Sequence, residues 1–245
     1  MLLKALNIVV VIAATFLVAP SAYAAAKIEV FVALADNESQ GIVPVPDELG
    51  DGSNPRTNLY WGALYGVKTY FSRSPAWQRT NCANPEESWI LERCEFVHKS
   101  TGATLTAHAY EGLHIPQAIK DYLEALTIEN EEDRILTAYI GHNGLMEFRP
   151  PPLPLKINLH APDAIILACS SRDYFEEWLH EAGAPAILWT TGLMAPEAYS
   201  LHDAIDAWLK EENATEIADA AAAAYAKYQK ISTRSARRLL ISGSD

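Results

Sequence analysis

Short apolar segments of β-strand character alternate with helix-like segments along most of this chain, and this alternation constrains the fold more than any other feature. The strand-like segments are residues 27–34, 134–141, 164–169 and 185–190. The helix-like segments, with apolar residues at helical spacing, are 56–72, 116–126, 174–179, 196–210 and 214–230. Connections of a dozen or more residues between strands are typical of parallel pairing. The sequence therefore predicts an α/β fold, with a mainly parallel sheet covered by helices on both faces.

One part of the chain departs from this alternation. Two β-like runs, residues 94–98 and 103–107, flank the tripeptide Ser100-Thr101-Gly102. Two strand-like runs joined by a short segment that contains glycine are typical of a β-hairpin. We therefore expect a hairpin inserted into the α/β fold.

The first 24 residues have the pattern of an export signal. Lys4 lies near the start, an apolar core covers residues 8–19, and Ala22-Tyr23-Ala24 provides a small-residue cleavage site. The apolar core is too short to span a bilayer comfortably, and no later run approaches the roughly 20 apolar residues that spanning requires. We expect residues 25–245 to form a single domain that is periplasmic or secreted, without membrane contact after cleavage. An uncleaved N-terminal anchor is the alternative.

Charge and residue spacing exclude several classes of partner. The chain has 31 acidic and 19 basic residues and a net charge of −12, which repels phosphate backbones, so we expect no nucleic-acid partner. The histidines and cysteines lack zinc-type spacing. The acidic segment 47–52 resembles a calcium loop, but Leu49 occupies the place of an oxygen ligand. We expect neither a metal nor a cofactor.

Three cysteines in an exported chain indicate one disulfide and one remaining thiol. Cys82 and Cys94 lie close together in a polar, loop-like stretch, so we expect a short bridge between them. Cys169 ends an apolar run and is followed by a polar segment that begins a helix, so its thiol lies where a buried strand emerges. A bridge from Cys169 to one of the other two cysteines is the alternative, and it would remove a nucleophile.

His142 follows the strand-like run 134–141 as Cys169 follows the run 164–169. Because sites in parallel sheets form at the carboxyl ends of strands, the fold can bring both side chains to one edge. An imidazole can accept the proton of a thiol, and the thiolate can then attack a carbonyl carbon. The pair therefore predicts acyl transfer. The alternatives are an inert buried cysteine and a histidine that caps a turn.

Two segments resemble the signature of the caspase-like cysteine peptidases, in which one apolar strand runs into His-Gly and a later one runs into Cys. They are Ala138-Tyr-Ile-Gly-His142-Asn143-Gly144 and Ile165-Ile-Leu-Ala168-Cys169, within a resemblance that covers residues 27–192. The resemblance implies a caspase-like three-layer fold, Cys169 as nucleophile and His142 as acid and base. It also implies backbone N–H groups, at the Cys and next to the His, that bind the oxyanion. Here Asn143 follows the histidine directly, so Asn143 or Gly144 supplies that donor, or the oxyanion site is defective.

The same resemblance implies where substrate binds. In caspase-like enzymes the pocket is shaped by the loop after the first strand and by the loop after the strand that succeeds the cysteine. The corresponding residues are Asp36, Asn37, Thr190, Thr191 and Gly192.

The implied function is that of an exported cysteine peptidase or amide hydrolase acting on a peptide or protein. The alternative is a non-catalytic caspase-like protein that binds a peptide or protein partner. A third class, an α/β small-molecule binder, needs a glycine-rich phosphate loop after the first strand, and residues 33–40 contain no glycine.

Overall fold

The computed structural model describes residues 26–86, 89–128, 134–152 and 160–243. Within these ranges, one eight-stranded sheet has the order β2-β3-β4-β1-β5-β6-β7-β8. Its strands are β1 (Lys27–Ala33), β2 (Trp77–Ala83), β3 (Ile90–His98), β4 (Thr104–Tyr110), β5 (Ile135–Ile140), β6 (Asp163–Leu167), β7 (Ala186–Thr190) and β8 (Leu240–Ile241). The central strands β4, β1, β5, β6 and β7 are parallel, whereas β2, β3 and β8 pair antiparallel at the edges. The predicted mainly parallel α/β sheet is confirmed.

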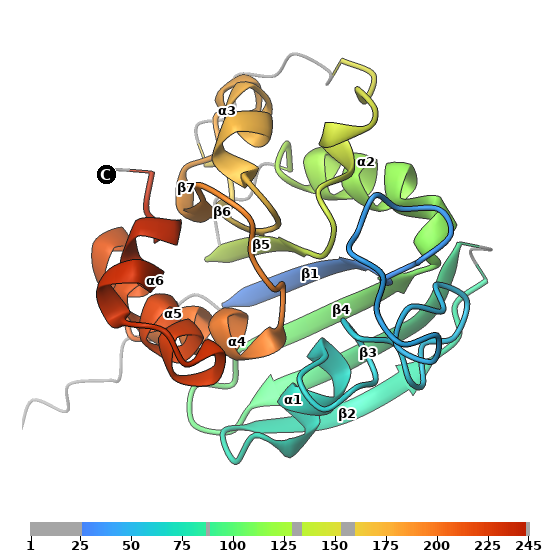
Figure 1. The fold of residues 1–245 in the computed structure, drawn as a ribbon. Helices are drawn as coiled ribbons and strands as arrows, with labels where there is room; N and C mark the ends of the chain where they lie inside the picture. Colours follow the sequence, from blue (N-terminus) through green and yellow to red (C-terminus); the bar gives the residue numbers. More distant parts are fainter. Residues whose placement is uncertain (1–25, 87–88, 129–133, 153–159, 244–245) are drawn as a thin grey trace, which may run out of the picture.

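Helices cover both faces of the sheet. They are α1 (Val67–Arg73), α2 (Ile115–Ala125), α3 (Ser171–Ala182), α4 (Ala198–Leu209), α5 (Ala214–Gln229) and α6 (Thr233–Leu239). Figure 1 shows α2 and α3 above the sheet and α1, α4 and α5 below it. Alternate residues of β1 serve the two sides: Val30 and Val32 belong to the core cluster that includes residues of α4 and α5, and Phe31 and Ala33 belong to the cluster that includes residues of α2 and α3. The three-layer arrangement buries both faces of the parallel strands, as such strands require.

The predicted hairpin is present as β3 and β4, which pair antiparallel. Gly102 in the turn between them has φ 74°, a left-handed conformation that glycine adopts without steric cost. The sequence did not predict β2, which extends the sheet beyond β3 and is largely exposed. Consequently Cys82 and Cys94 lie opposite each other on β2 and β3 rather than in the loop that we expected.

The prediction of one helix over residues 56–72 was wrong, because only Val67–Arg73 is helical at its end. The preceding residues form consecutive turns fixed by the buried Asn58. Its Oδ1 accepts the N–H groups of Ala35 (3.0 Å) and Tyr60 (3.1 Å), and its Nδ2 donates to the carbonyl of Ala35 (2.8 Å). These bonds hold the segment against the end of β1, so Tyr60 and Trp61 are buried without a helix.

The structure describes the chain from residue 230 to residue 243 but not its first 25 residues. After residue 230 the chain forms α6 and then β8, which pairs with β7. The predicted export signal, residues 1–24, lies outside the described residues. Of the helices that the structure describes, none combines the length and the apolar character needed to cross a membrane.

Candidate functional site

His142 and Cys169 follow the carboxyl ends of β5 and β6, which are neighbouring parallel strands. Gly141, between β5 and His142, has φ 152°, and a Cβ on it would approach the carbonyl oxygen of Ala33 to 3.0 Å. After Cys169 the chain turns sharply into α3 through Ser170, which has φ 47°. A non-glycine residue in this left-handed region costs about 1 to 3 kcal/mol, and such positions cluster at functional sites. Both candidate residues therefore lie on tightly constrained turns at one edge of the sheet.

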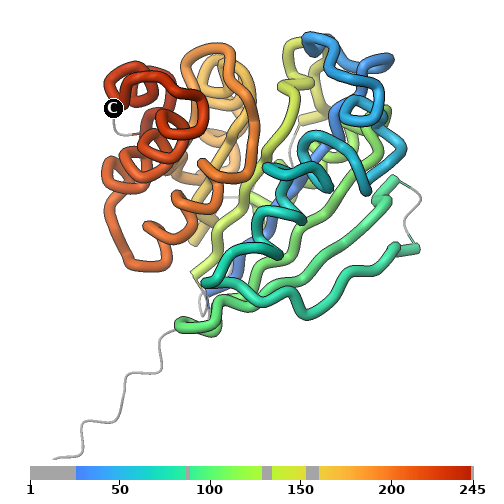
Figure 2. Tube along the Cα trace, turned by 60° about the horizontal axis from the view of Figure 1, so that its bottom comes forward, coloured from blue at the N-terminus to red at the C-terminus, as the bar shows by residue number. Residues whose placement is uncertain are grey.

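His142 and Cys169 line the same cavity, of about 470 Å³. We call it the apolar cavity, because most of its other lining side chains are aliphatic. These other residues are Gly41, Ile42, Val43, Val45, Leu59, Tyr60, Gly141, Met146, Leu193, Met194, Ala195, Pro196 and Glu197. Figure 2 shows the blue loop after β1 beside the yellow-green segment after β5 at the upper end of the sheet. The cavity therefore lies where segments distant in the sequence meet.

Glu147 fixes the ring of His142. The Nε2 of His142 lies 2.8 Å from Oε1 of Glu147, and the same oxygen accepts the N–H of Gly41 at 2.8 Å. The phenol of Tyr139 donates to the carbonyl of His142 at 2.7 Å. An ionised carboxylate only accepts hydrogen bonds, so Nε2 carries the proton and Nδ1 is the nitrogen that can accept one. Glu147 was not among the site residues predicted from the sequence.

Cys169 is the free cysteine of the chain, because Cys82 and Cys94 form the predicted disulfide. Its thiol contacts the backbone of Met194: Sγ lies 3.6 Å from the carbonyl oxygen and 3.4 Å from the N–H nitrogen. The side chain is half-buried at the wall of the apolar cavity. The loop after β7 thus holds the thiol without cross-linking it.

Asn143 and Gly144, the two candidate oxyanion donors, have different roles in the turn. The fully buried Asn143 donates from Nδ2 to the carbonyl of Cys169 at 2.7 Å and accepts the N–H of Leu145 at 3.1 Å. Gly144 donates its N–H to the carbonyl of His142 at 3.1 Å. The side chain of Asn143 therefore connects the two strand ends, and the N–H of Gly144 is occupied within the turn. Asn143 remains the candidate backbone donor.

Two of the five candidate substrate-binding residues lie at a second cavity. Asp36 and Asn37 line this space of about 730 Å³ together with Glu38, Asp47, Asp51 and Glu111, among others. We call it the acidic cavity. The carboxylate of Asp36 accepts hydrogen bonds from the N–H of Glu38 at 2.9 Å and the hydroxyl of Ser39 at 2.7 Å. These bonds turn the chain, so the later residues 41–45 reach the apolar cavity instead.

The other three candidates, Thr190, Thr191 and Gly192, lie just before the lining residues of the second loop. The buried Thr190 donates its hydroxyl to the carbonyl of Ala168. Thr191 donates its hydroxyl to the carbonyl of Arg238 at 2.6 Å, and the carbonyl of Gly192 accepts the N–H of Ser170 at 2.8 Å. All three serve the local structure. The structure thus brings the two expected loops to the site through residues 41–45 and 193–197, which the sequence analysis did not single out.

Two further polar side chains face the apolar cavity, Tyr60 and Glu197. Burial raises the pKa of Tyr60, and the neighbouring ionisable groups of Cys169 and Glu197 raise it further. Burial also raises the pKa of Glu197, against hydrogen bonds from Tyr199 and Gln229 that lower it. Tyr60 therefore keeps its proton at neutral pH and can donate it in a hydrogen bond to a substrate.

No family model, curated protein or solved structure matches this chain. The chemistry of the apolar cavity is therefore the feature of this chain that indicates a function.

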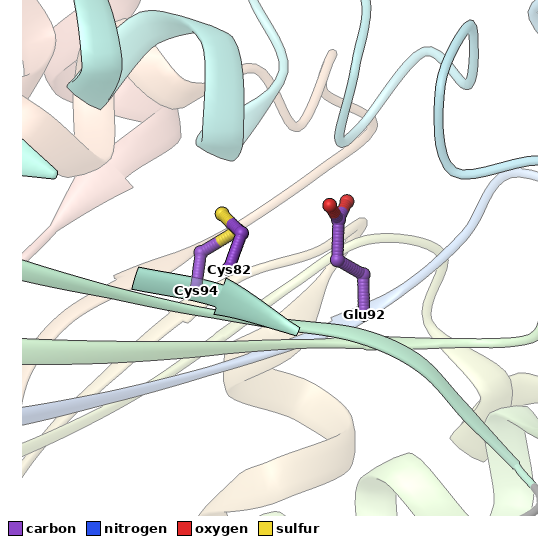
Figure 3. Close-up of side chains that lie close together, drawn as sticks. All are labelled: Cys82, Glu92 and Cys94. Carbon is purple, nitrogen blue, oxygen red and sulfur yellow. A yellow bond between two sulfur atoms is a disulfide. The ribbon is translucent and has the colours of Figure 1, made fainter. Parts of the chain in front are cut away.

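One group of potential metal-ligating atoms occurs among the described residues, formed by Cys82, Glu92 and Cys94. Figure 3 shows the two cysteines joined through sulfur, with the carboxylate of Glu92 directed to the same side of β3. The sulfurs are used in the disulfide. The carboxylate of Glu92 pairs with Lys68 at 2.7 Å and accepts the indole N–H of Trp61 at 2.6 Å. These three residues therefore stabilise the sheet edge, and we assign no metal to them.

Proposed function

We propose that the protein is an exported, caspase-like cysteine hydrolase that cleaves an amide or ester bond of a peptide or protein substrate. One observation carries the proposal: His142 and Cys169, at the ends of neighbouring parallel strands, line a single cavity. A free thiol and an imidazole that a carboxylate orients, both in the wall of one cavity, are the parts of an activated nucleophile. The disulfide between Cys82 and Cys94 agrees with an oxidising compartment.

The proposed reaction begins with the thiol of Cys169. Nδ1 of His142 accepts the thiol proton, and the thiolate forms a C–S bond to the carbonyl carbon while the carbonyl electron pair moves to oxygen. When the tetrahedral intermediate collapses, the C–N or C–O bond breaks and His142 returns the proton to the leaving amine or alcohol. Water, deprotonated by His142, then attacks the thioester carbon. The carboxylic acid leaves and the thiol of Cys169 is regenerated.

The other residues of the site assist by position. Glu147 orients the ring of His142 and stabilises its protonated form during the reaction. Asn143 holds the end of β6 through the carbonyl of Cys169. The backbone N–H groups of Asn143 and Cys169 are the candidate oxyanion donors, and the tight turns preorganise them.

Acylation by a p-nitrophenyl ester tests the proposal. The expected result for residues 25–245 is a burst of p-nitrophenol and one acyl group, found by peptide mass spectrometry on Cys169. Cys169→Ala should abolish the burst, and His142→Ala should slow it by about 10²-fold or more, because general acid–base catalysis contributes that much.

His114→Ala is the matched control, because His114 pairs with Glu111 at 2.8 Å but does not line the apolar cavity. It should leave the burst unchanged. A wild-type protein that is not acylated, or a His142→Ala variant acylated at the wild-type rate, would contradict the proposal and favour a non-catalytic binding protein.

A further inference from the structure

Large apolar side chains are exposed at the mouth of the cavity that contains Cys169. Val43 is 86% exposed, Leu193 is 80% exposed and Met146 is 38% exposed, and all three line the apolar cavity. They come from three separate loops, after β1, β7 and β5. Exposed apolar side chains are ordinary when they are scattered, but when they gather around a concave site they indicate a surface that binds apolar groups.

The charges around this cavity do not match a charged substrate side chain. No Lys or Arg lines it among the described residues, so an acidic side chain would find no cation there. The single carboxylate in its wall, Glu197, already accepts the hydroxyl of Tyr199 at 2.9 Å and the amide of Gln229 at 3.1 Å on the same oxygen. A basic side chain that paired with Glu197 would have to share this carboxylate with both donors or use its other oxygen, and would leave water for an apolar wall.

The size of the cavity also fits a side chain adjacent to the attacked bond. A volume of about 470 Å³ lies within the usual range for sites that bury most of a small ligand. The thiol of Cys169 is in the wall, held beside Met194, so a group that fills the cavity brings its neighbouring carbonyl to the sulfur.

We infer that the substrate carries an uncharged apolar side chain next to the carbonyl that Cys169 attacks, and that Val43, Met146 and Leu193 select it. This inference rests on the proposed hydrolase function. It names the chemical class of substrate: a peptide with an aliphatic or aromatic residue on the acyl side of the cleaved bond.

Three peptidyl acyloxymethyl ketones that differ only in the side chain beside the ketone, leucine, arginine or aspartate, test the inference. With each probe the thiolate forms a C–S bond to the methylene carbon, and the C–O bond breaks as the carboxylate leaves with its electron pair. Peptide mapping of the wild-type protein should show that the leucine probe modifies Cys169 at least about tenfold faster than the other two.

Leu193→Glu and Leu113→Glu form a matched pair of variants. Leu113 is also exposed, at 63%, but it lines the acidic cavity. Leu193→Glu should slow the leucine probe by about tenfold and speed the arginine probe, because it places a carboxylate where the apolar side chain binds. Leu113→Glu should change neither rate.

Different failures have different meanings. If the arginine or aspartate probe reacts fastest, or if Leu193→Glu leaves the order of the probes unchanged, the inference about the substrate is overturned and the hydrolase proposal stands. If no probe modifies Cys169 faster in the wild type than in His142→Ala, the hydrolase proposal falls and the inference falls with it.

Discussion

The loop after β1 contributes to two cavities of opposite chemistry. Its residues 41–43 and 45 line the apolar cavity, in which His142 and Cys169 are the polar groups that can react. The flanking residues 36–39, 47 and 50–53 line the larger acidic cavity, which has Asp36, Asp47 and Asp51 in its wall. The acidic cavity contains more charge, but the carboxylates of Asp36 and Asp51 accept hydrogen bonds within the loop itself.

Hydrogen bonding explains this difference. Asp51 accepts the N–H of Ser53 at 2.9 Å and the hydroxyl of Ser53 at 2.7 Å, and these bonds lower its pKa. Side chains of Asp and Ser that bond to the backbone two or three residues away are a common way to build turns. In the apolar cavity, burial raises the pKa of Glu197 instead. A group of acidic residues does not by itself identify a site when some of its carboxylates, here those of Asp36 and Asp51, already stabilise turns of the same loop.

Removing the thiol should have the largest effect. Turnover of an ester or peptide substrate by Cys169→Ala should fall by about 10⁴-fold or more, because loss of a covalent nucleophile leaves only binding and oxyanion stabilisation. Asp51→Ala, in the acidic cavity, should retain turnover within about twofold of the wild type. A Cys169→Ala variant with more than a tenth of wild-type turnover would contradict the assignment of the reaction to the apolar cavity rather than to the acidic one.

The sheet edge that carries the disulfide provides a region outside both cavities. Replacing Cys82 and Cys94 by alanine should lower the free energy of unfolding by about 3 kcal/mol, because the bridge closes a loop with a sequence separation of 12 and so restricts the unfolded chain. Denaturant titration measures this change. The acylation rate of Cys169 should stay the same, and a matching loss of acylation in the folded variant would show that the edge and the apolar cavity are coupled.

The carboxylate that orients the histidine should have a smaller effect. Glu147→Gln should lower kcat by at least about tenfold while KM stays nearly constant, because Gln can still accept the N–H of Gly41 but cannot stabilise a protonated ring. Glu111→Gln, which alters the His114 pair, is the control. Equal kinetics for the two variants would exclude a positioning role for Glu147.

The smallest effect concerns the ionisation of one carboxyl group from each cavity. In an NMR titration Glu197 should titrate above its ordinary value of 4.5 and Asp51 below its ordinary value of 3.8. Glu197 binds its proton more tightly in the folded chain, so its contribution to stability is present below pH 4.5 and is lost as the pH rises through the folded pKa. The contribution of Asp51 is present above pH 3.8 and is lost as the pH falls through its folded pKa.

Two variants measure these contributions separately. Relative to the wild type, Glu197→Gln should gain free energy of unfolding as the pH rises from 4.5 to 7, since its amide still accepts from Tyr199 and Gln229. Relative to the wild type, Asp51→Asn should lose free energy of unfolding as the pH rises from below 3.8. If the free energy of unfolding of both variants, relative to the wild type, changed in the same direction with pH, the opposite pKa shifts of Glu197 and Asp51 would be contradicted.

The sequence contained most of the information about the sheet. The strands β5 and β6 are short apolar runs that are buried on both faces, so their composition alone distinguishes them. The edge strand β2 has a largely exposed sequence, Gln78 to Asn81 included, so it has no apolar alternation to detect. Residues 56–66 resembled a helix because their apolar side chains recur at helical spacing. In the structure these residues form turns, and the hydrogen bonds of Asn58 hold the turns so that Tyr60 and Trp61 are buried.

The site was predictable only in part. Parallel strands bring their carboxyl ends to one edge, so the common position of His142 and Cys169 followed from topology. The role of Glu147 depends on the short 3₁₀ turn Gly144–Met146, which returns the chain to the histidine ring. The positions of Val43 and Leu193 depend on the path of two irregular loops, for which no sequence periodicity exists.

A crystal structure of residues 25–245 after reaction with the leucine ketone would show whether Cys169 is the nucleophile of the apolar cavity. We expect a covalent bond from Sγ of Cys169 to the probe, the ring of His142 within hydrogen-bonding distance of the adduct, and the leucine side chain between Val43 and Leu193. A sulfur cross-linked to Cys82 or Cys94, or a probe bound in the acidic cavity, would contradict it.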